Sequence, residues 1–294
     1  MKTLIVYNPK SGRGKFKDCI DTLIMALKEI NINDVSVFSS DRPKEITDFL
    51  LLQAHKFSIL ILSGGDGTLN ECINALMLIN HKPQLLYIPS GTVNDVGRML
   101  KLSKKPLEAI KLLVNKPVKM DVVQINNRYF LYAAACGKFS NVSYETKHHQ
   151  LKKRMGKFYY YLRTIKDLFV DNRFCVNRVK AYLFLVLNTN SLGSFKLRWQ
   201  KSLKLNDGLV RLMIFPYKNK LSFLHFVFFM LLGDYYKFGR IDKIDSQFEL
   251  TIDKNLTLNT DGEVACVDNC FKIIVHREAI ALFVEKDIKK LYFE

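Results

Sequence analysis

Short apolar runs alternate with amphipathic runs along the first third of the chain. The apolar runs have the length of strands and are Thr3–Tyr7, Val35–Phe38, Ser58–Leu62 and Leu85–Ile88. The amphipathic runs repeat apolar residues at helical spacing and are Phe16–Ile30, Glu45–Ala54, Leu69–Ile79 and Asn94–Leu100. This alternation predicts a parallel sheet wrapped by helices.

The pattern changes after residue 117, where short strands follow one another. The expected strands are Val118–Ile125, Tyr129–Ala135, Lys180–Asn188, Leu209–Phe215, Ser246–Ile252, Leu256–Leu258, Phe271–His276 and Ile280–Phe283. Helices are expected only at Lys157–Phe169 and Leu221–Leu232. This half therefore reads as mainly antiparallel β structure. We expect two domains, 1–117 and 118–294, and the sequence leaves open whether the last strands return to the first domain.

Three loops with polar and glycine residues each follow a strand of the predicted parallel sheet. They are Asn8–Gly12, Gly64–Thr68 and Gly91–Asp95. Ligands of such sheets bind at the carboxyl ends of the strands, so the three loops should meet at one edge. Glycines let the backbone approach a ligand closely, and the following helix N-termini favour phosphate. Asp66 would repel a phosphate, so we expect it to handle a metal ion or a hydroxyl group.

Composition narrows the class of protein only modestly. Hydrophobic residues make up 48% of the 294 residues, and the formal net charge is +17. Such a charge favours an anionic partner, although a lysine-rich solvated surface explains it equally well. The six cysteines lack zinc spacing and are expected to be reduced thiols. No apolar run reaches the roughly 20 residues of a membrane-spanning helix, and no export signal is evident, so a cytoplasmic protein is expected.

The order of several motifs makes the chain resemble a known family. NPKSGRG, GGDGTLNE, PSGTVNDVGR, a stretch from Met120 to Thr146, LNDGLV and NTDGEV follow one another along the sequence. Together they resemble the bacterial soluble diacylglycerol kinases, relatives of sphingosine and ceramide kinases. The resemblance implies a three-layer α/β nucleotide-binding domain followed by a β-sandwich. It also implies phosphoryl transfer from ATP, with Mg²⁺, to diacylglycerol or a similar lipid.

The resemblance also implies particular site residues. Those expected to bind ATP are Asn8, Pro9, Lys10, Ser11, Gly12, Ser40, Gly64, Gly65, Asp66, Gly67, Thr68, Asn70 and Thr92. Glu263 matches the family's general base, and Asp66 and Asp121 match its catalytic aspartates. Asp207 matches a second, structural Mg²⁺ site that the backbone carbonyls of Lys204 and Leu209 complete. Without the resemblance, Glu263 would be read as a hairpin-tip acid, and Asp207 as a turn residue.

Two other functions stay open at this point. One is an NAD kinase-like enzyme with a soluble acceptor, and the other is an inactive basic module that binds a membrane or nucleic acid. No nucleic-acid-binding motif is present, so a nucleic-acid partner is not expected. The basic run Lys147–Lys157, followed by aromatic residues, suits peripheral contact with the inner, anionic membrane face. A homodimer stays open, as does the effect of the short segment 170–181 on the choice of lipid.

Overall fold

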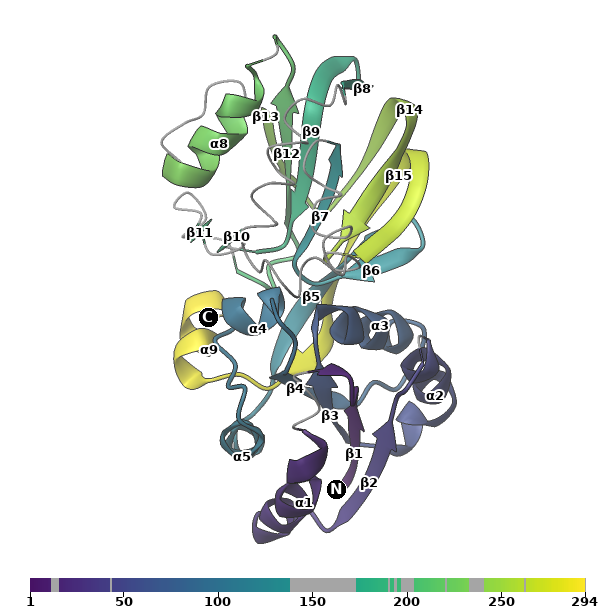
Figure 1. Ribbon diagram of the computed structural model, residues 1–294, viewed down its shortest axis with the longest axis vertical. Coiled ribbons are helices and arrows are strands. Elements are labelled where there is room, and N and C mark those ends of the chain that lie inside the picture. Colours follow the sequence, from purple (N-terminus) through teal and green to yellow (C-terminus); the bar gives the residue numbers. More distant parts are fainter. Residues whose placement is uncertain are drawn as a thin grey trace. The chain divides into compact units, whose positions relative to one another are not determined.

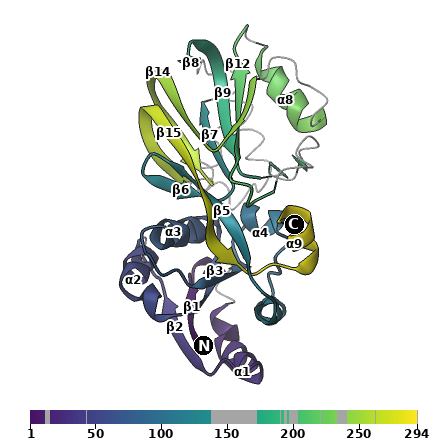
Figure 2. The same cartoon turned by 180° about the vertical axis from the view of Figure 1, so that it is seen from behind.

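The chain forms two compact units, each built from more than one segment. The computed structural model describes residues 1–11, 16–42, 44–137, 173–189, 191–192, 195–196, 204–219, 221–232, 241–261 and 263–293. The first unit comprises residues 1–122, 204–208 and 276–294, and the second comprises residues 123–203 and 209–275. Figures 1 and 2 show their elements from opposite sides. Across the described ranges, no helix is both long enough and apolar enough to cross a membrane.

A parallel sheet organises the first unit. Its strands are β1 (Lys2–Tyr7), β2 (Asp34–Ser39), β3 (Ile59–Gly64) and β4 (Gln84–Pro89), in the order β2-β1-β3-β4. Tyr7 pairs with Ser39 and Ser63, and Gly64 pairs with Pro89, so the four strands end level with one another. The carboxyl-terminal end of β15 (Glu263–Leu282) lies beside β4, where Leu282 pairs in parallel with Leu85.

Helices cover this sheet with apolar residues at helical spacing. They are α1 (Ile20–Glu29), α2 (Glu45–Gln53), α3 (Asp66–Leu76), α4 (Asp95–Met99), α5 (Pro106–Ala109) and α9 (Lys286–Tyr292), with short 3-10 helices at Lys17–Cys19, Ala54–Lys56 and Ile110–Val114. Leu23 and Leu27 of α1 are buried one turn apart, as are Ile46 and Leu50 of α2. The expected α/β alternation is therefore confirmed, with shifts at the element ends.

The second unit is mainly antiparallel. Its strands are β5 (Val118–Ile125, shared with the first unit), β6 (Arg128–Phe130), β7 (Ala133–Gly137), β8 (Phe174–Val176), β9 (Val179–Leu187), β10 (Ser191–Leu192), β11 (Phe195–Lys196), β12 (Val210–Pro216), β13 (Ile241–Asp245), β14 (Gln247–Thr260) and the first part of β15. They run in the order β13-β12-β9-β7-β14-β15, and β8 pairs with both β14 and β9. Helix α8 (Phe223–Leu232) lies among the described residues of this unit.

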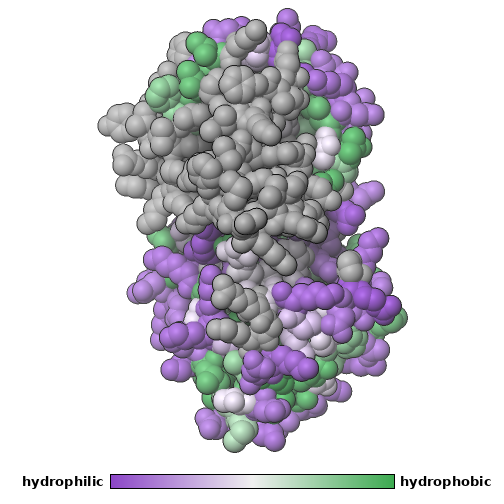
Figure 3. All heavy atoms as spheres, viewed as in Figure 1, coloured by the Kyte–Doolittle hydropathy of each residue, from purple (hydrophilic) through white to green (hydrophobic). Residues whose placement is uncertain are grey.

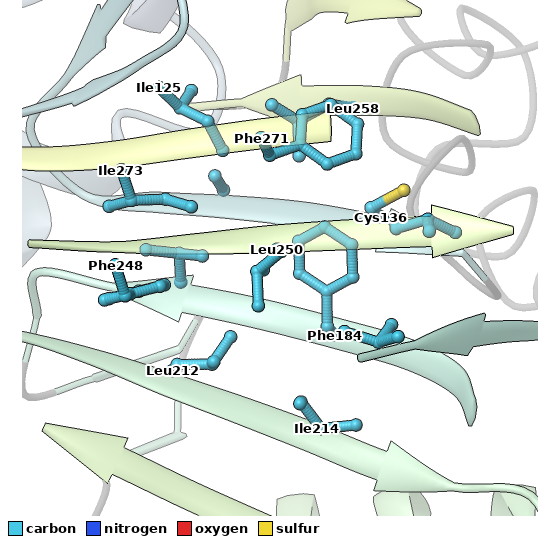
Figure 4. Close-up of a cluster of buried hydrophobic side chains, with 14 of the residues drawn as sticks. Ile125, Cys136, Phe184, Leu212, Ile214, Phe248, Leu250, Leu258, Phe271 and Ile273 are labelled. Carbon is cyan, nitrogen blue, oxygen red and sulfur yellow. The ribbon is translucent and has the colours of Figure 1, made fainter. Parts of the chain in front are cut away.

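Aromatic and aliphatic side chains fill the interior of the second unit. Figure 4 shows Phe184 and Phe271 pointing toward each other, and their ring centroids are 5.9 Å apart. The opposite face of β9 and β12 is buried as well, and Phe229 of α8 packs on Phe215 there with a centroid distance of 5.7 Å. Burial on both faces explains why Ala181–Leu187 of β9 is an unbroken apolar run rather than an alternating one.

Several expected strand boundaries are wrong. Tyr129–Ala135 was expected as one strand, but it breaks after Phe130 into β6 and β7. The four expected strands after residue 245 are instead two long ones, β14 and β15, and β14 changes register within its length. Single polar or charged residues suggest strand ends in a sequence, whereas a bulge lets a long strand pass through them.

The division into units also differs from the expected boundary at residue 117. β5 continues to Ile125 while the first unit extends only to Val122, so one strand serves both units. Residues 204–208 and 276–294 belong to the first unit. The sequence left the return of the last strands open, and it did not indicate the return of residues 204–208. The expected helix Lys157–Phe169 and the basic run Lys147–Lys157 lie outside the described residues.

Hydrophilic residues predominate over the described surface of the first unit in Figure 3, interrupted by smaller groups of hydrophobic ones. Exposed apolar side chains on this unit include Met25, Leu52 and Leu78, which are 64 to 68% exposed. They come from α1, from α2 and from the turn after α3, and scattered exposed apolar residues of this kind need no functional explanation.

Candidate active site

Four loops meet at the carboxyl edge of the parallel sheet because its strands end level. We call them the β1 loop (8–11), the β2 end (40–42), the β3 loop (64–68) and the β4 loop (91–95). Asn8 joins the first to the third, since its N–H donates to the Ser63 carbonyl at 3.0 Å and its side-chain amide lies 3.5 Å from the Thr68 hydroxyl. Lys10 reaches the β2 end, where its ammonium group donates to the Asp41 carbonyl at 2.8 Å.

The β3 and β4 loops touch backbone to backbone. A Cβ atom added to Gly91 would lie 2.6 Å from the Gly65 Cα and 2.8 Å from the Asn94 side-chain oxygen. A Cβ atom on Gly65 would lie 3.3 Å from the Gly91 Cα and 3.7 Å from the Ser11 hydroxyl. Glycine is therefore required for a close approach of the two loops, which brings main-chain N–H groups of neighbouring strand ends together.

Asp66, the first residue of α3, holds the β4 loop in place. One oxygen of its carboxylate accepts the Asn94 N–H at 2.8 Å, and the other accepts the Asp95 N–H at 2.7 Å. These donors stand at the start of α4, where backbone N–H groups have no partner within the helix. Asp66 is only 9% exposed, so these charge-assisted bonds are largely shielded from water. The sequence predicted a metal or hydroxyl role for Asp66, and the structure adds this anchoring role.

Asn94 closes the β4 loop on itself. Its backbone is left-handed, with φ of 53°, and its side chain is completely buried. The side-chain oxygen accepts the Gly91 N–H at 2.9 Å, and the side-chain amide donates to the Gly91 carbonyl at 2.6 Å. Asparagine tolerates this conformation better than most residues and mimics a backbone turn. Gly91 and Asn94 are absent from the predicted ATP-binding set, although the GTVND motif contains both.

Two further polar side chains, Tyr87 and Glu71, hold the elements around these loops in place. The Tyr87 hydroxyl donates to the Gly64 carbonyl at 3.1 Å, and burial raises the pKa of this phenol, so it keeps its proton. Glu71, on α3, accepts the backbone N–H of Thr47 at 3.1 Å. Burial raises the pKa of Glu71 despite this hydrogen bond. The glutamate of the GGDGTLNE motif thus ties α3 to α2.

Asp121 lies at the end of the first unit's part of β5, and its hydrogen bonds run to two returning segments. Its carboxylate accepts the Gly208 N–H and the Glu278 N–H, both at 2.7 Å, and its own N–H donates to the Leu205 carbonyl at 2.8 Å. The side chain is fully buried, and burial raises its pKa more than the two hydrogen bonds lower it. Asp121 therefore attaches residues 204–208 and 276–278 to this unit.

The predicted second metal site belongs to the same segment. The Asp207 carboxylate accepts the Lys204 N–H at 3.2 Å, which closes a turn, and Gly208 follows with a φ of +78°. A carboxylate and backbone carbonyls are the oxygen donors that Mg²⁺ prefers, so the donor set of Lys204, Asp207 and Leu209 fits this ion. Among the described residues, no three carboxylate, imidazole or thiol side chains gather in the manner of a metal cluster.

Glu263 begins β15 in the second unit, at a hairpin turn. It pairs with Thr260 across the turn, and its side chain is partly exposed. Asp261, within the turn, accepts the backbone N–H groups of Leu131, Tyr132 and Ala133 at 3.0 Å each. The hairpin-tip position that the sequence indicated for Glu263 is therefore correct, whereas the anchoring role of Asp261 was missed.

Comparisons with known proteins identify the family. The model of the diacylglycerol kinase catalytic domain matches residues 2–125. A diacylglycerol kinase of Staphylococcus haemolyticus is 32% identical over 275 residues, which cover 88% of this chain and 81% of that protein. One of Staphylococcus saprophyticus is 30% identical over 298 residues, which cover 97% and 96% of the two chains. This chain belongs to the diacylglycerol kinase family.

The fold agrees with this membership. The crystal structure of a diacylglycerol kinase from Bacillus anthracis superimposes with a TM-score of 0.75 and covers 98% of each chain, at 24% identity. The superposition confirms the mixed α/β fold, whereas the Staphylococcus relatives confirm the predicted family along nearly the whole sequence.

The structure also places the other residues predicted to bind ATP. The Ser40 N–H donates to the Tyr7 carbonyl at 3.0 Å, which places Ser40 beside the β1 loop. The Asn70 side-chain oxygen accepts the Asn74 amide at 3.2 Å along α3. Gly67 lies in the first turn of α3. Pro9 and Thr92 belong to the β1 and β4 loops, and Gly12 lies outside the described residues.

Proposed function

We propose that this protein transfers the γ-phosphoryl group of ATP to the hydroxyl of diacylglycerol or a closely related lipid. Membership of the diacylglycerol kinase family makes it an ATP-dependent lipid kinase. The observation that carries the proposal is the contact of the β3 and β4 loops through Gly65 and Gly91, held by Asp66. Backbone N–H groups gathered at the carboxyl edge of a parallel sheet suit a polyphosphate.

In the proposed reaction, the lipid oxygen attacks the γ-phosphorus, the bond to the bridging oxygen of ADP breaks, and ADP leaves. The β1, β3 and β4 loops, with Ser40 and Asn70, bind and orient the nucleotide. Glu263 accepts the proton of the lipid hydroxyl as the bond to phosphorus forms. Mg²⁺, when bound with the nucleotide, neutralises charge on the phosphate oxygens. Asp66 and Asp121 hold the loops that frame the site.

A second Mg²⁺ ion is proposed to have a structural role at residues 204–209. The Asp207 carboxylate and the carbonyls of Lys204 and Leu209 would hold it, with water as further ligands. The ion would stiffen a turn that Asp121 already attaches to the first unit. The proposal rests on the donor set and on the turn that Lys204 and Asp207 close.

The finer architecture and the location in the cell are part of the same proposal. We take the first unit as a three-layer α/β nucleotide-binding domain and the second as a β-sandwich that receives the lipid. A lipid acceptor requires peripheral contact with a membrane, and the net charge of +17 suits the anionic inner face of the cytoplasmic membrane.

A panel of acceptors with labelled ATP and Mg²⁺ tests the proposal. Diacylglycerol, ceramide, sphingosine, phosphatidylglycerol, undecaprenol and NAD are offered separately, the lipids in mixed micelles. We expect label in a lipid and none in NAD. Labelling of NAD alone would refute the lipid assignment and support a soluble acceptor. The Glu263→Gln variant serves as the control for turnover that depends on the proposed base.

A further inference from the structure

The Asp261 carboxylate is an unusual feature of the hairpin that carries Glu263. Its Oδ2 atom accepts the Leu131 N–H, and its Oδ1 atom accepts the N–H groups of Tyr132 and Ala133, all at 3.0 Å. The Asp261 N–H in turn donates to the Ala133 carbonyl at 2.8 Å. Four hydrogen bonds therefore connect one turn residue to a segment 128 to 130 positions earlier in the chain.

The segment that Asp261 binds is the break between β6 and β7. Its backbone leaves the sheet at Leu131 and Tyr132, so the strand ladder does not satisfy their polar groups. Asn188 donates hydrogen bonds to the carbonyls: its side-chain amide donates to Leu131 at 3.1 Å, and its N–H donates to Tyr132 at 2.9 Å. The Asp261 carboxylate accepts the N–H groups of the same two residues. The break is thus held from both sides by fixed partners.

The turn itself is tight, so Asp261 and Glu263 cannot move independently. Thr260 pairs with Glu263 in the strand register, which leaves a two-residue connection between β14 and β15. Asp261 has a φ of 48°, the left-handed conformation that such hairpin turns require at their first central residue. A shift of Asp261 would therefore be passed directly to the backbone of Glu263.

We propose that Asp261 is a positioning residue that fixes the Glu263 carboxylate for proton transfer. The inference rests on the proposed role of Glu263 as the base. A carboxylate is the side chain suited to this place, because both of its oxygens accept and its charge strengthens each bond. A carboxamide of the same shape has one accepting oxygen, and its NH₂ group would face a backbone donor.

The Asp261→Asn variant tests the inference through kcat and the KM for ATP. We expect kcat to fall roughly 10- to 100-fold, because displacing a catalytic group by up to about 1 Å has an effect of this size. The KM for ATP should stay unchanged, because the nucleotide loops belong to the first unit. Kinetics are measured well below the melting temperature of the variant. An unchanged kcat, or a fall in kcat matched by an equal loss of folded protein, would overturn the inference.

Asp268→Asn is the matched control. Asp268 lies further along β15, and its carboxylate also accepts three donors: the N–H groups of Asn269 and Cys270 and the Asn126 side-chain amide. It is not part of the turn, so its replacement should alter stability without lowering kcat. A fall in kcat equal to that of Asp261→Asn would show that any lost anchor in this unit impairs turnover, which contradicts a specific positioning role.

Two further variants keep the outcomes distinct. If Asp261→Asn does not fold, Asn188→Ala removes the side-chain bond to the Leu131 carbonyl and keeps the backbone bond to Tyr132. We then expect a smaller fall in kcat with the same KM for ATP. An unchanged kcat in that variant would then overturn the inference. Glu263→Gln is measured alongside. If it retains the wild-type kcat, the proposed base is wrong. If it loses kcat while Asp261→Asn does not, only the positioning role is wrong.

Discussion

Asp66 in the first unit and Asp261 in the second perform the same physical task in different surroundings. Each carboxylate accepts backbone N–H groups with both oxygens and so fixes a loop. Asp66 reaches residues 28 and 29 positions ahead, across the level ends of neighbouring parallel strands. Asp261 reaches back 128 to 130 positions, to the start of β7, the antiparallel neighbour of β14.

The difference shows how each architecture builds its part of a site. Parallel strands bring several loops to one edge, so Asp66 joins two loops that can bind one ligand. An antiparallel hairpin presents a single turn, so Asp261 can only hold that turn against an irregular neighbour. We therefore expect damage to the first anchor to impair nucleotide binding, and damage to the second to impair the chemical step.

The largest expected effect follows from Asp66→Asn. The carboxamide accepts only one of the two N–H donors, so the β4 loop should shift and the protein should lose about 1–3 kcal/mol of stability. We expect the KM for ATP to rise at least about tenfold, and kcat to fall as well. Steady-state kinetics and urea unfolding measure this, with the exposed Asp21→Asn on α1 as control. If Asp66→Asn had the wild-type KM for ATP, Asp66 would not be needed for nucleotide binding, and the expected contrast with Asp261 would be wrong.

Adding a side chain where the β3 and β4 loops touch tests whether their close contact is needed. The Cβ of Gly91→Ala would meet the Gly65 Cα at 2.6 Å, so the loops must separate, at a cost of about 1–3 kcal/mol. In Gly65→Ala the nearest atom lies at 3.3 Å, so the effect on the KM for ATP and on the urea midpoint should be smaller. Equal effects of the two variants would mean that the close approach does not matter.

The proposed ion at residues 204–209 should stabilise the first unit measurably. At about ten times its dissociation constant, Mg²⁺ should add about 1.4 kcal/mol to the free energy of unfolding. Asp207→Ala should abolish this increment, whereas Asp287→Ala on α9 should retain it. Differential scanning calorimetry with and without Mg²⁺ decides the matter, and an equal rise in Tm in wild type and Asp207→Ala would leave Asp207 as a turn residue only.

The smallest effect concerns two glutamates whose carboxylates both accept backbone N–H groups. Burial raises the pKa of Glu71 above the ordinary glutamate value of 4.5, whereas backbone hydrogen bonds lower the pKa of the partly exposed Glu45. Stability contributed by Glu71 should be present below pH 4.5 and be lost as pH rises through the folded pKa. For Glu45 it should be present above pH 4.5 and be lost as pH falls through the folded pKa.

Urea unfolding of wild type, Glu71→Gln and Glu45→Gln over a pH series measures both contributions. The difference between wild type and Glu71→Gln should shrink as pH rises above the ordinary glutamate range. The difference between wild type and Glu45→Gln should shrink as pH falls below it. The same direction in both variants would show that burial does not govern the pKa of Glu71.

The order of several motifs along the chain indicated the family by resemblance, and local patterns predicted the four parallel strands and the loops that follow them. Strand length, helical spacing and glycine-rich turns are properties of neighbouring residues, so periodicity reveals them. The meeting of the β1, β3 and β4 loops could also be inferred, because parallel strands place their carboxyl ends at one edge. The hairpin position of Glu263 followed from Asp261-Gly262, a turn signal readable in the sequence.

Only the tertiary structure decided which carboxylates act as anchors. Asp66, Asp121 and Asp261 each bind backbone N–H groups that lie from 28 to 157 positions away. Such bonds depend on which backbone N–H groups are left without a partner by strand pairing. The periodicity of the sequence does not indicate which groups those are. The same limit explains the missed break between β6 and β7 and the return of residues 204–208 and 276–294. Pairing with residues far away in the chain decides where these segments lie, and the local sequence does not encode that pairing.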